Sequence, residues 1–211
     1  MSEPAAVTLT VIRQFADLFA RVRRPFIQEA ETGWVTRHDS LEDTHLHAHL
    51  HGVATFGVRL EKADGGGRIA SNLALEVDFG DRETPVDAVL ADILGERGLT
   101  LVTAIHDAGQ RLGIPPGAWV FAWSGGRSLH AWLTLRDWVP LTIAYTVARS
   151  LHDAVNQRIA SCGLHVCTAW PTNAKRQGKA IRLPWSRHQG TGERGRFVNL
   201  RDGALTLREP F

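Results

Sequence analysis

The first pattern along the chain is helical. Apolar side chains recur every three to four positions, at Ile12, Phe15, Phe19 and Val22. This spacing places them on one face of a helix, and Pro25 stands just past its end, so we predict a helix over residues 9–24. Capping residues at the start of a run, or a glycine at its end, predict further helices over residues 40–51, 84–97, 101–112 and 141–161.

Alternation of apolar and polar residues predicts strands between these helices. In residues 72–78 the period is two, which is typical of a half-buried strand. Strands are expected at residues 55–61, 72–78, 118–123, 128–135, 164–168, 179–183, 196–200 and 205–208. Because helices and strands are mixed in this order, the sequence predicts an α/β (α+β) fold.

The length of 211 residues is that of one domain, and the sequence has no repeat, low-complexity tract or linker. We expect a single domain over residues 1–211, with an N-terminal helical part at about 9–51 and a core at about 52–211. Hydrophobic residues make up 44% of the chain, but no apolar run reaches the length of a membrane helix. The start of the chain lacks the pattern of a signal peptide, and two cysteines make no disulfide framework, so we expect a cytoplasmic protein.

Charge is distributed unevenly, although the net charge is only +2. Residues 1–120 carry a net charge of −6, and residues 121–211 carry +8. Nucleic acids and triphosphates are polyanions, so the basic C-terminal part is the expected binding side. The candidate DNA-binding residues there are Lys175, Arg176, Lys179 and Arg187. Trp170 and Trp185 lie among these charges, where an indole can either stack on a base or pack in the core.

Three short blocks hold the residues with the clearest chemistry. In the first, LALEVDFGD at residues 73–81, a strand places Glu76 and Asp78 on one face and the leucines on the other. Hard cations such as Mg²⁺ and Mn²⁺ bind to such carboxylates together with substrate phosphates. Asp81 is a third, less constrained acid. Two solvated acids on an edge strand would give the same pattern.

The second block, SGGRSLHAWL at residues 124–133, is a glycine turn followed by a strand. Its glycines let a ligand approach the backbone, and Arg127 offers a planar fork that matches phosphate. Ser124 and Ser128 add hydroxyl groups, and His130 follows on the strand. An ordinary hairpin with a histidine at the edge of the core also fits this block.

The third block, IRLPWSRHQGTG at residues 181–192, is a basic loop with a proline and two glycines. Arg182 and His188 can both reach a phosphate group, and Ser186 lies between them. A basic surface loop without a ligand is the alternative interpretation.

In this order and spacing, the three blocks resemble the motifs of the archaeo-eukaryotic primase (AEP) superfamily. The first resembles its acid-x-acid metal motif, the second its Ser-Gly-x-x-Gly-x-His nucleotide motif, with Ser128 where the family usually has glycine, and the third its basic segment with Ser-x-His and Thr-Gly. Upstream, residues 15–19 and 49–58 resemble stretches of prokaryotic primase-polymerases (PrimPol). The resemblance therefore covers roughly residues 10–200.

This resemblance implies a central, mostly antiparallel sheet with helices outside it and the active site in a cleft. It implies that Glu76 and Asp78 are catalytic and hold two Mg²⁺ or Mn²⁺ ions. The residues that it implies for nucleotide binding are Ser124, Arg127, Ser128, His130, Arg182, Ser186 and His188. The implied activity is that of a DNA primase and DNA polymerase. In this reaction a 3′-hydroxyl attacks the α-phosphorus of an NTP or dNTP on a single-stranded DNA template, and pyrophosphate leaves.

One departure concerns the third metal-binding aspartate of the family. Active members carry it on the strand before the third block, but residues 163–173 contain no Asp or Glu. His165 or Cys167 can occupy its place, and imidazole and thiol suit softer metals than Mg²⁺. Two alternatives therefore stay open. One is a catalytically weakened domain that binds nucleotides or single-stranded DNA in replication initiation or defence, and the other is an end-joining-type polymerase domain.

Four histidines, His45, His47, His49 and His51, form two i,i+4 pairs, a spacing that can bind zinc on a helix. No cysteine or further histidine stands nearby to complete either site, so we expect polar-face histidines and no zinc. A zinc site at Cys162 and Cys167 is not expected either, because no second pair accompanies them. The expected partners are single-stranded DNA and nucleotides, with a helicase or accessory domain as a further candidate and no membrane.

Overall fold

Two antiparallel sheets form the frame of this computed structural model, which describes residues 7–208. The smaller sheet has the order β2 (Gly33–Arg37), β1 (Phe26–Ala30), β3 (Phe56–Val58), β9 (Ile181–Arg182). The larger sheet has the order β11 (Ala204–Arg208), β10 (Arg196–Arg201), β6 (Trp119–Trp123), β7 (Ser128–Pro140), β5 (Gly67–Asp78), β4 (Glu61–Asp64), and β8 (Val166–Trp170) also pairs with β5. The α/β fold with antiparallel sheets, expected from the sequence, is confirmed.

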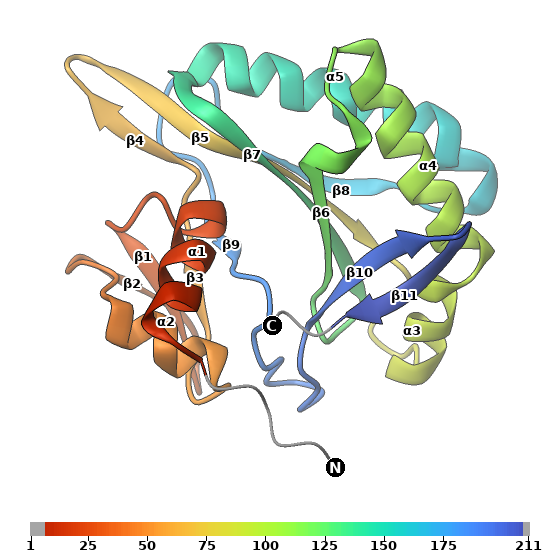
Figure 1. Cartoon of the computed structure of the whole chain (residues 1–211), viewed down its shortest axis with the longest axis horizontal. Coiled ribbons are helices and arrows are strands. Elements are labelled where there is room, and N and C mark those ends of the chain that lie inside the picture. The colour runs from red at the N-terminus through yellow and green to blue at the C-terminus, as the bar shows by residue number, and fades with distance from the viewer. Residues whose placement is uncertain (1–6, 209–211) are drawn as a thin grey trace.

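Helices cover the sheets from outside (Figure 1). On one face of the larger sheet lie α3 (Val86–Leu94), α4 (Glu96–Arg111) and α5 (Leu141–Ile159). On its other face, beside the smaller sheet, lie α1 (Leu9–Phe19) and α2 (Asp43–Leu50). Two 3₁₀ turns, η1 (Pro116–Ala118) and η2 (Ala160–Cys162), complete the regular structure of the described residues. None of the helices within residues 7–208 has the length and apolar character that a membrane crossing requires.

The alternating faces of the central strands separate two hydrophobic cores. Leu73, Leu75 and Val77 of β5 pack with α3, α4 and α5 in the larger core. Ala74, on the opposite face of β5, packs with Trp132 of β7 in the smaller core, together with residues of α1 and α2. The predicted alternation of these strands is therefore confirmed, and Glu76 and Asp78 share the face of Ala74.

Several predicted boundaries are wrong, and each error has a local cause. The predicted strand 55–61 is divided, since β3 belongs to the smaller sheet and β4 to the larger. The helix predicted from residue 40 begins later, because Glu42 is the N-cap and exchanges capping hydrogen bonds with His45. The β1–β2 hairpin was not predicted, because every residue of β2 is exposed and its sequence shows no alternation. The expectation about a signal peptide concerns the start of the chain, where residues 1–6 lie outside the described residues.

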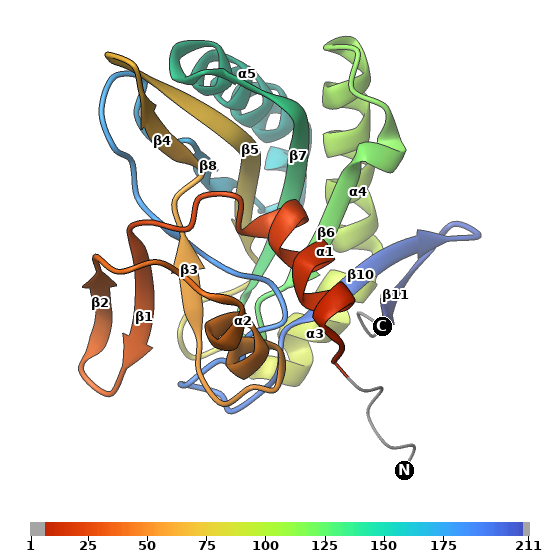
Figure 2. The same cartoon turned by 60° about the vertical axis from the view of Figure 1, so that its left-hand side comes forward.

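The segment 171–180 connects the two sheets. Figure 2 shows it running from β8, past the β4–β5 hairpin, to β9 in the smaller sheet. Glu61, which is buried on β4, accepts a hydrogen bond from the backbone N–H of Gly178 at 2.7 Å, and Arg59 donates to the carbonyl of the same glycine. The segment is thereby fixed against the larger sheet before it enters the smaller one, and it forms one wall of the space between them.

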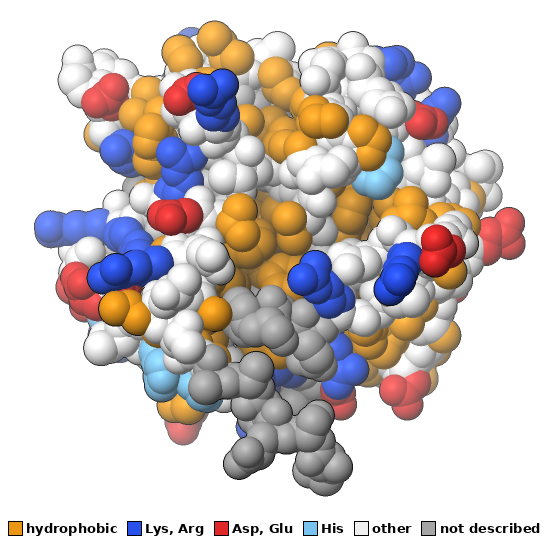
Figure 3. All heavy atoms as spheres, viewed as in Figure 1, with side chains coloured by type: hydrophobic (Ala, Val, Ile, Leu, Met, Phe, Trp, Pro, Cys, Tyr) orange, Lys and Arg blue, Asp and Glu red, His pale blue; other side chains and the backbone are white. Residues whose placement is uncertain are grey.

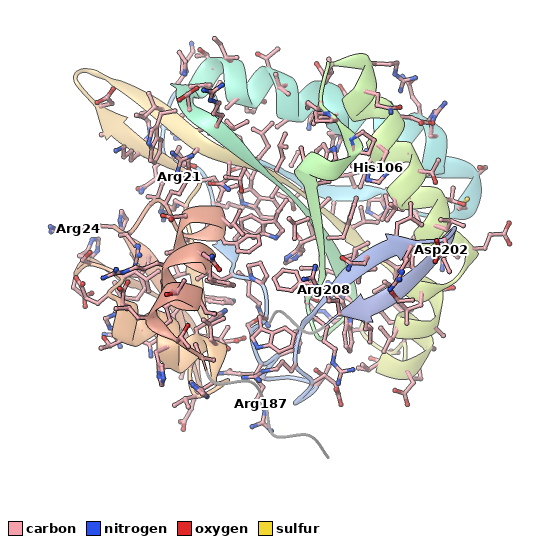
Figure 4. The ribbon with its side chains drawn as sticks, viewed as in Figure 1. Arg21, Arg24, His106, Arg187, Asp202 and Arg208 are labelled. Atoms are coloured by element: carbon pink, nitrogen blue, oxygen red, sulfur yellow. The ribbon has the colours of Figure 1, made fainter. Side chains whose placement is uncertain are left out.

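A hollow of about 780 Å³ lies on the face between α1, η1, β6 and β10. Figure 3 shows hydrophobic side chains gathered on this face, and Figure 4 labels two polar residues, His106 and Arg208, that line the hollow. None of the candidate site residues from the three sequence blocks lines it. The predicted chemistry therefore belongs to a different part of the molecule.

Candidate active site

A cleft of about 1210 Å³ lies between the two sheets. The larger sheet contributes Glu76 of β5 and His130 of β7, and the smaller sheet contributes Trp34 of β2 and Arg182 of β9. The third sequence block adds His188 to the lining. Residues from all three blocks thus line one cleft, although the first and third blocks are about 100 positions apart in sequence.

Strand register brings the acids of the first block to the hydroxyls and imidazole of the second. In the antiparallel pair β5–β7, Glu76 lies opposite His130 and Asp78 lies opposite Ser128. Nε2 of His130 is 3.4 Å from Oε1 of Glu76, and the side chain of His130 is only 6% exposed. The imidazole therefore contacts a carboxylate, and it also lines the cleft.

Both oxygens of Asp78 have partners. Ser128 donates its hydroxyl proton to Oδ1 at 2.6 Å, and Nε of Arg127 is 3.0 Å from Oδ2. The Asp78 side chain is 22% exposed and does not itself line the cleft, whereas its partners Arg127 and Ser128 do. Arg127 thus occupies, with its own positive charge, a position beside the carboxylate that a cation would otherwise take.

The charge of Glu76 is stabilised by its neighbours. Burial alone would raise its pKa, but the hydrogen bond and charge of His130 oppose this effect, and the hydroxyls of Thr168 and Ser128 add to them. The net result is a pKa below the ordinary value of a glutamate. Glu76 is therefore ionised at neutral pH and can bind a cation.

Basic groups form the other side of the cleft. Arg182 makes an ion pair with Glu29 at 3.0 Å, while its Nη1 is buried and has no hydrogen-bond partner within the described residues. Burial lowers the pKa of Arg182, and the carboxylates of Glu29 and Glu76 oppose this shift. Burial also lowers the pKa of His188, to about 4, and the nearby charges of Arg182 and Arg127 act in the same direction. A neutral imidazole near two guanidinium groups makes a site that is suited to binding an anion.

The glycine turn of the second block touches the loop of the third. Gly125 has a φ of +79°, which favours glycine, and its carbonyl accepts a hydrogen bond from Oγ1 of Thr191 at 2.7 Å. A Cβ atom on Gly126 would lie 2.7 Å from Nε2 of His188. Ser124 accepts hydrogen bonds at Oγ from the backbone of Gly126 and Ser128 and so holds the turn itself. The absence of a side chain at Gly126 therefore lets His188 approach.

Strand β8 brings Cys167, rather than His165, to the carboxylates. It pairs with β5 through an irregularity between Glu76 and Val77. Burial raises the pKa of Cys167 to about 11, and the charges of Asp78 and Glu76 are among the further causes of the rise. Neither Cys167 nor His165 lines the cleft, and Nε2 of His165 is 3.7 Å from Sγ of Cys167. A protonated thiol thus lies beside Asp78 and Glu76.

The remaining candidate residues divide between the cleft and other places. Arg176 and Lys179 line the cleft, whereas Lys175 and Arg187 do not. Figure 4 shows Arg187 at the lower edge of the molecule. Ser186 is 1% exposed and does not line the cleft. Trp170 and Trp185 are 4% and 5% exposed and pack in the smaller core, and Trp170 also lines the cleft.

Sequence analysis missed two residues of the site, Glu29 and Trp34. Both lie on the β1–β2 hairpin, where they face each other in the antiparallel register. The turn residues Glu31, Thr32 and Gly33 between two β-favouring runs are a hairpin signal that could have predicted this element. No motif in the three blocks indicated that it contributes to the cleft.

The donor atoms present fit one divalent ion better than two. Glu76 and Asp78 supply carboxylate oxygens, and Mg²⁺ is commonly bound by one or two carboxylates with substrate phosphates and water. Within residues 7–208, no group of three or more His, Cys, Asp or Glu side chains is arranged to hold a metal ion. Asp81, the third acid of the block, accepts hydrogen bonds from Thr84 and from the backbone of Glu83. A shared ion completed by a bound triphosphate is compatible with this set of ligands.

The four histidines of the N-terminal part have separate roles in the structure. His45 accepts a hydrogen bond from the Glu42 backbone at the start of α2, and His49 is fully buried. His47 and His51 are exposed, with ring centroids 4.3 Å apart. The two cysteines are free thiols.

No protein-family model and no curated protein matches the sequence. Among solved structures, the fold is similar to the polymerase domain of Ligase D from Mycobacterium tuberculosis in complex with DNA. The TM-score is 0.49 and the identity 16%, over 90% of this chain and 68% of that chain. It is also similar to the AEP domain of the cyanophage S-2L primase-polymerase (PrimPol), with a TM-score of 0.47 and 18% identity, over 94% of this chain and 92% of that chain.

Proposed function

We propose that this protein is a nucleotidyltransferase that synthesises or extends primers on single-stranded DNA. The observation that carries the proposal is one cleft lined by the ionised carboxylate of Glu76, the guanidinium groups of Arg127 and Arg182 and the neutral imidazole of His188, with Asp78 paired to Arg127. Carboxylates and basic groups that line the same cleft suit a substrate made of a divalent cation and a triphosphate. The cleft is also large enough to hold a nucleotide beside a DNA end.

In this proposal the residues of the cleft act by position and charge. Glu76 and Asp78 hold the divalent ion, which would stabilise the attacking 3′-oxygen and the leaving pyrophosphate when bound. Arg182 of the smaller sheet and His188 of the 186–192 loop bind the β- and γ-phosphates. Arg127 turns from Asp78 to the triphosphate. Arg176 and Lys179, at the edge of the same cleft, attract the backbone of the template strand.

The second candidate function is a weakened domain that binds nucleotides or single-stranded DNA without efficient synthesis. The observation in its favour is the thiol of Cys167 beside Asp78 and Glu76. A protonated thiol is a poor ligand for a hard cation, so a second ion would be held weakly there.

A primer-extension assay on single-stranded DNA, with Mg²⁺ and Mn²⁺ in parallel, tests the proposal. Asp78→Ala should lower the rate by roughly a hundredfold or more, the scale of losing one preorganised electrostatic contact to the transition state. Asp137→Ala, an exposed acid on β7 outside the cleft, is the matched control and should leave the rate unchanged. Equal rates for Asp78→Ala and wild type would refute the assignment of the acids.

The variant Cys167→Asp separates the two candidate functions. If the wild-type protein binds nucleotide but makes no product, and Cys167→Asp makes product with Mg²⁺, the missing third carboxylate explains the weakness. Cys167→Ser serves as the control for loss of the thiol alone. Efficient synthesis by the wild-type protein in either metal, at a rate that Cys167→Asp does not raise, would exclude the weakened domain.

A further inference from the structure

Trp34 is a large aromatic side chain that is left exposed inside the cleft. It lies on β2, is 41% exposed and lines the same space as Glu76 and His188. Exposed tryptophan in a concave site is unusual, because burying an indole is favourable and the side chain dominates many binding contacts. The side chain is thus available to a ligand that enters the cleft.

The position of this indole is fixed by charged neighbours. The guanidinium carbon of Arg182 lies 5.2 Å from the centroid of the Trp34 ring, which is a cation–π contact. Arg182 is in turn held by Glu29 at 3.0 Å, and Glu29 is the register partner of Trp34 across the hairpin. The two strands and the arginine therefore hold the ring in place before any ligand arrives.

The same contact relates the indole to the phosphate groups of a nucleotide. Arg182 has a buried Nη1 without a partner in the described residues, and its positive charge contributes to the lowered pKa of His188. In a nucleotide, the ribose separates the base from the phosphates by a few ångströms. If Arg182 and His188 hold the phosphates, the base can therefore reach Trp34, which contacts Arg182 directly. Every nucleobase has a π face that can stack on an indole, whatever its hydrogen-bonding edge.

From these contacts we propose that Trp34 is the stacking platform for the base of the incoming nucleoside triphosphate. Glu29 is a positioning residue that keeps Arg182 between the platform and the phosphates. The inference rests on the proposed function, because it assigns the base of the nucleotide that the cleft would bind. Stacking is tolerant of base identity, so the platform should add affinity for all four nucleotides and little selectivity among them.

Calorimetric titration with two probes tests this assignment. The probes are ATP and tripolyphosphate, each with Mg²⁺, and tripolyphosphate has the phosphates but no base. Trp34→Ala should weaken ATP binding by roughly tenfold or more, as expected for the loss of one stacked base, and leave tripolyphosphate binding within about twofold. Trp34→Phe should recover much of the ATP affinity. Arg182→Ala should weaken both probes.

Trp138→Ala is the matched control. Trp138 also contacts cations, with Nζ of Lys62 at 4.2 Å from its ring centroid, but it does not line the cleft. Its replacement should leave the affinity for both probes unchanged. Circular dichroism of the Trp34 variants would show whether the fold is kept.

Each other outcome overturns the inference in a distinct way. If Trp34→Ala weakens ATP and tripolyphosphate equally, the indole only supports Arg182. If ATP binding is unchanged but binding of an oligothymidylate falls, the platform belongs to the template strand. Wild-type protein that binds neither ATP nor tripolyphosphate would overturn the proposed function together with this inference, whereas the first two outcomes leave that function standing.

Discussion

Asp78 shows how a residue predicted as a metal ligand can already have partners in the fold. Ser128 and Arg127 contact its two oxygens at 2.6 Å and 3.0 Å. The guanidinium group of Arg127 therefore competes with any cation for the carboxylate. The competition is of modest strength, because both side chains are partly exposed, at 41% for Arg127 and 22% for Asp78.

Removing the guanidinium group of Arg127 should have opposite effects on the affinities for Mn²⁺ and for a nucleoside triphosphate. We expect Arg127→Ala to tighten Mn²⁺ binding in the absence of nucleotide by up to about fivefold, the scale of an ion pair worth about 1 kcal/mol. The same variant should weaken binding of a nucleoside triphosphate, which loses a cationic partner. Electron paramagnetic resonance of free Mn²⁺ during a titration measures the first effect, and calorimetry measures the second.

The control for this prediction is Arg149→Ala, which removes an exposed ion pair with Asp153 on α5. Neither residue of this pair lines the cleft. It should change neither affinity. Mn²⁺ affinity that stays the same in Arg127→Ala would mean that Asp78 is not the residue that binds the ion.

At the scale of residues, the sequence predicted which types of group meet but not all of their contacts. The period of two in residues 72–78 was enough to place Glu76 and Asp78 on one face. The contact between Arg127 and Asp78 depends on how the glycine turn folds back onto β5, which no local pattern specifies. The role of Trp34 could not be predicted, because its partner Arg182 is 148 positions away.

The glycine turn at residues 124–127 is the element that joins the second block to the third. Its backbone lies against the 186–192 loop, since the carbonyl of Gly125 accepts from Thr191. Gly126 lies so near His188 that a Cβ atom would be 2.7 Å from Nε2. Real Cβ atoms do not approach so closely, so the imidazole would have to move.

We therefore expect Gly126→Ala to displace His188 and to raise the KM for the nucleotide several-fold. The thermal midpoint should fall little, because the displaced atoms belong to the end of a side chain. Gly117→Ala in η1, where a Cβ would meet nothing within 4 Å, is the matched control. Steady-state kinetics and a thermal melt measure the two effects. A KM equal to that of the control would show that the position of His188 does not matter for the nucleotide.

Elements differ in how well their patterns predict them. Strand β5 and strand β7 are half-buried, so each shows an alternation that fixes its faces. The hairpin β1–β2 has one fully exposed strand and gives no such signal. The division of residues 55–61 between two sheets follows from a close backbone approach at Gly57, where a Cβ would lie 2.7 Å from the carbonyl oxygen of Ile181. This approach is a tertiary contact, and a sequence window cannot contain it.

For the molecule as a whole, the uneven charge predicts how DNA binding should respond to salt. Residues 121–211 carry a net charge of +8, and two of their basic side chains, Arg176 and Lys179, line the cleft. On a single strand, the logarithm of the affinity should fall linearly with the logarithm of salt concentration, with a slope of about −0.7 for each phosphate contacted.

The double variant Arg176→Ala/Lys179→Ala should make this slope shallower by about 1 to 1.5. Lys175→Ala is the control, because Lys175 is a neighbour in sequence that does not line the cleft. Fluorescence anisotropy of a labelled oligothymidylate over a range of salt concentrations measures the slope. An equal change in the control would mean that the segment 171–180 attracts DNA without directing it into the cleft.

The stability of the whole molecule should depend on the protonation of His49, which joins three parts of the chain. Its Nδ1 accepts from the Phe56 backbone at 3.2 Å, and its Nε2 is 2.8 Å from the carbonyl of Pro184. Helix α2, strand β3 and the third sequence block thus meet at one neutral imidazole. Burial lowers the pKa of His49 from 6.5 to about 4, and the charges of Arg194 and Arg182 also favour the neutral ring.

Because the folded protein prefers the neutral ring, the contribution of His49 to stability is fully present above pH 6.5 and is lost as the pH falls towards 4. Over this range the free energy of unfolding should fall by about 3 kcal/mol from this group alone. His188, with a pKa of about 4, and the carboxylates also titrate as the pH falls, so the comparison must be between variants. His49→Gln should be less stable than the wild type at pH 7, but its free energy of unfolding should fall less as the pH is lowered. His38→Gln, at an exposed position, should show the same pH dependence as the wild type. Urea unfolding at a series of pH values measures this difference. A wild-type curve parallel to that of His49→Gln would mean that the buried ring is protonated in the native state.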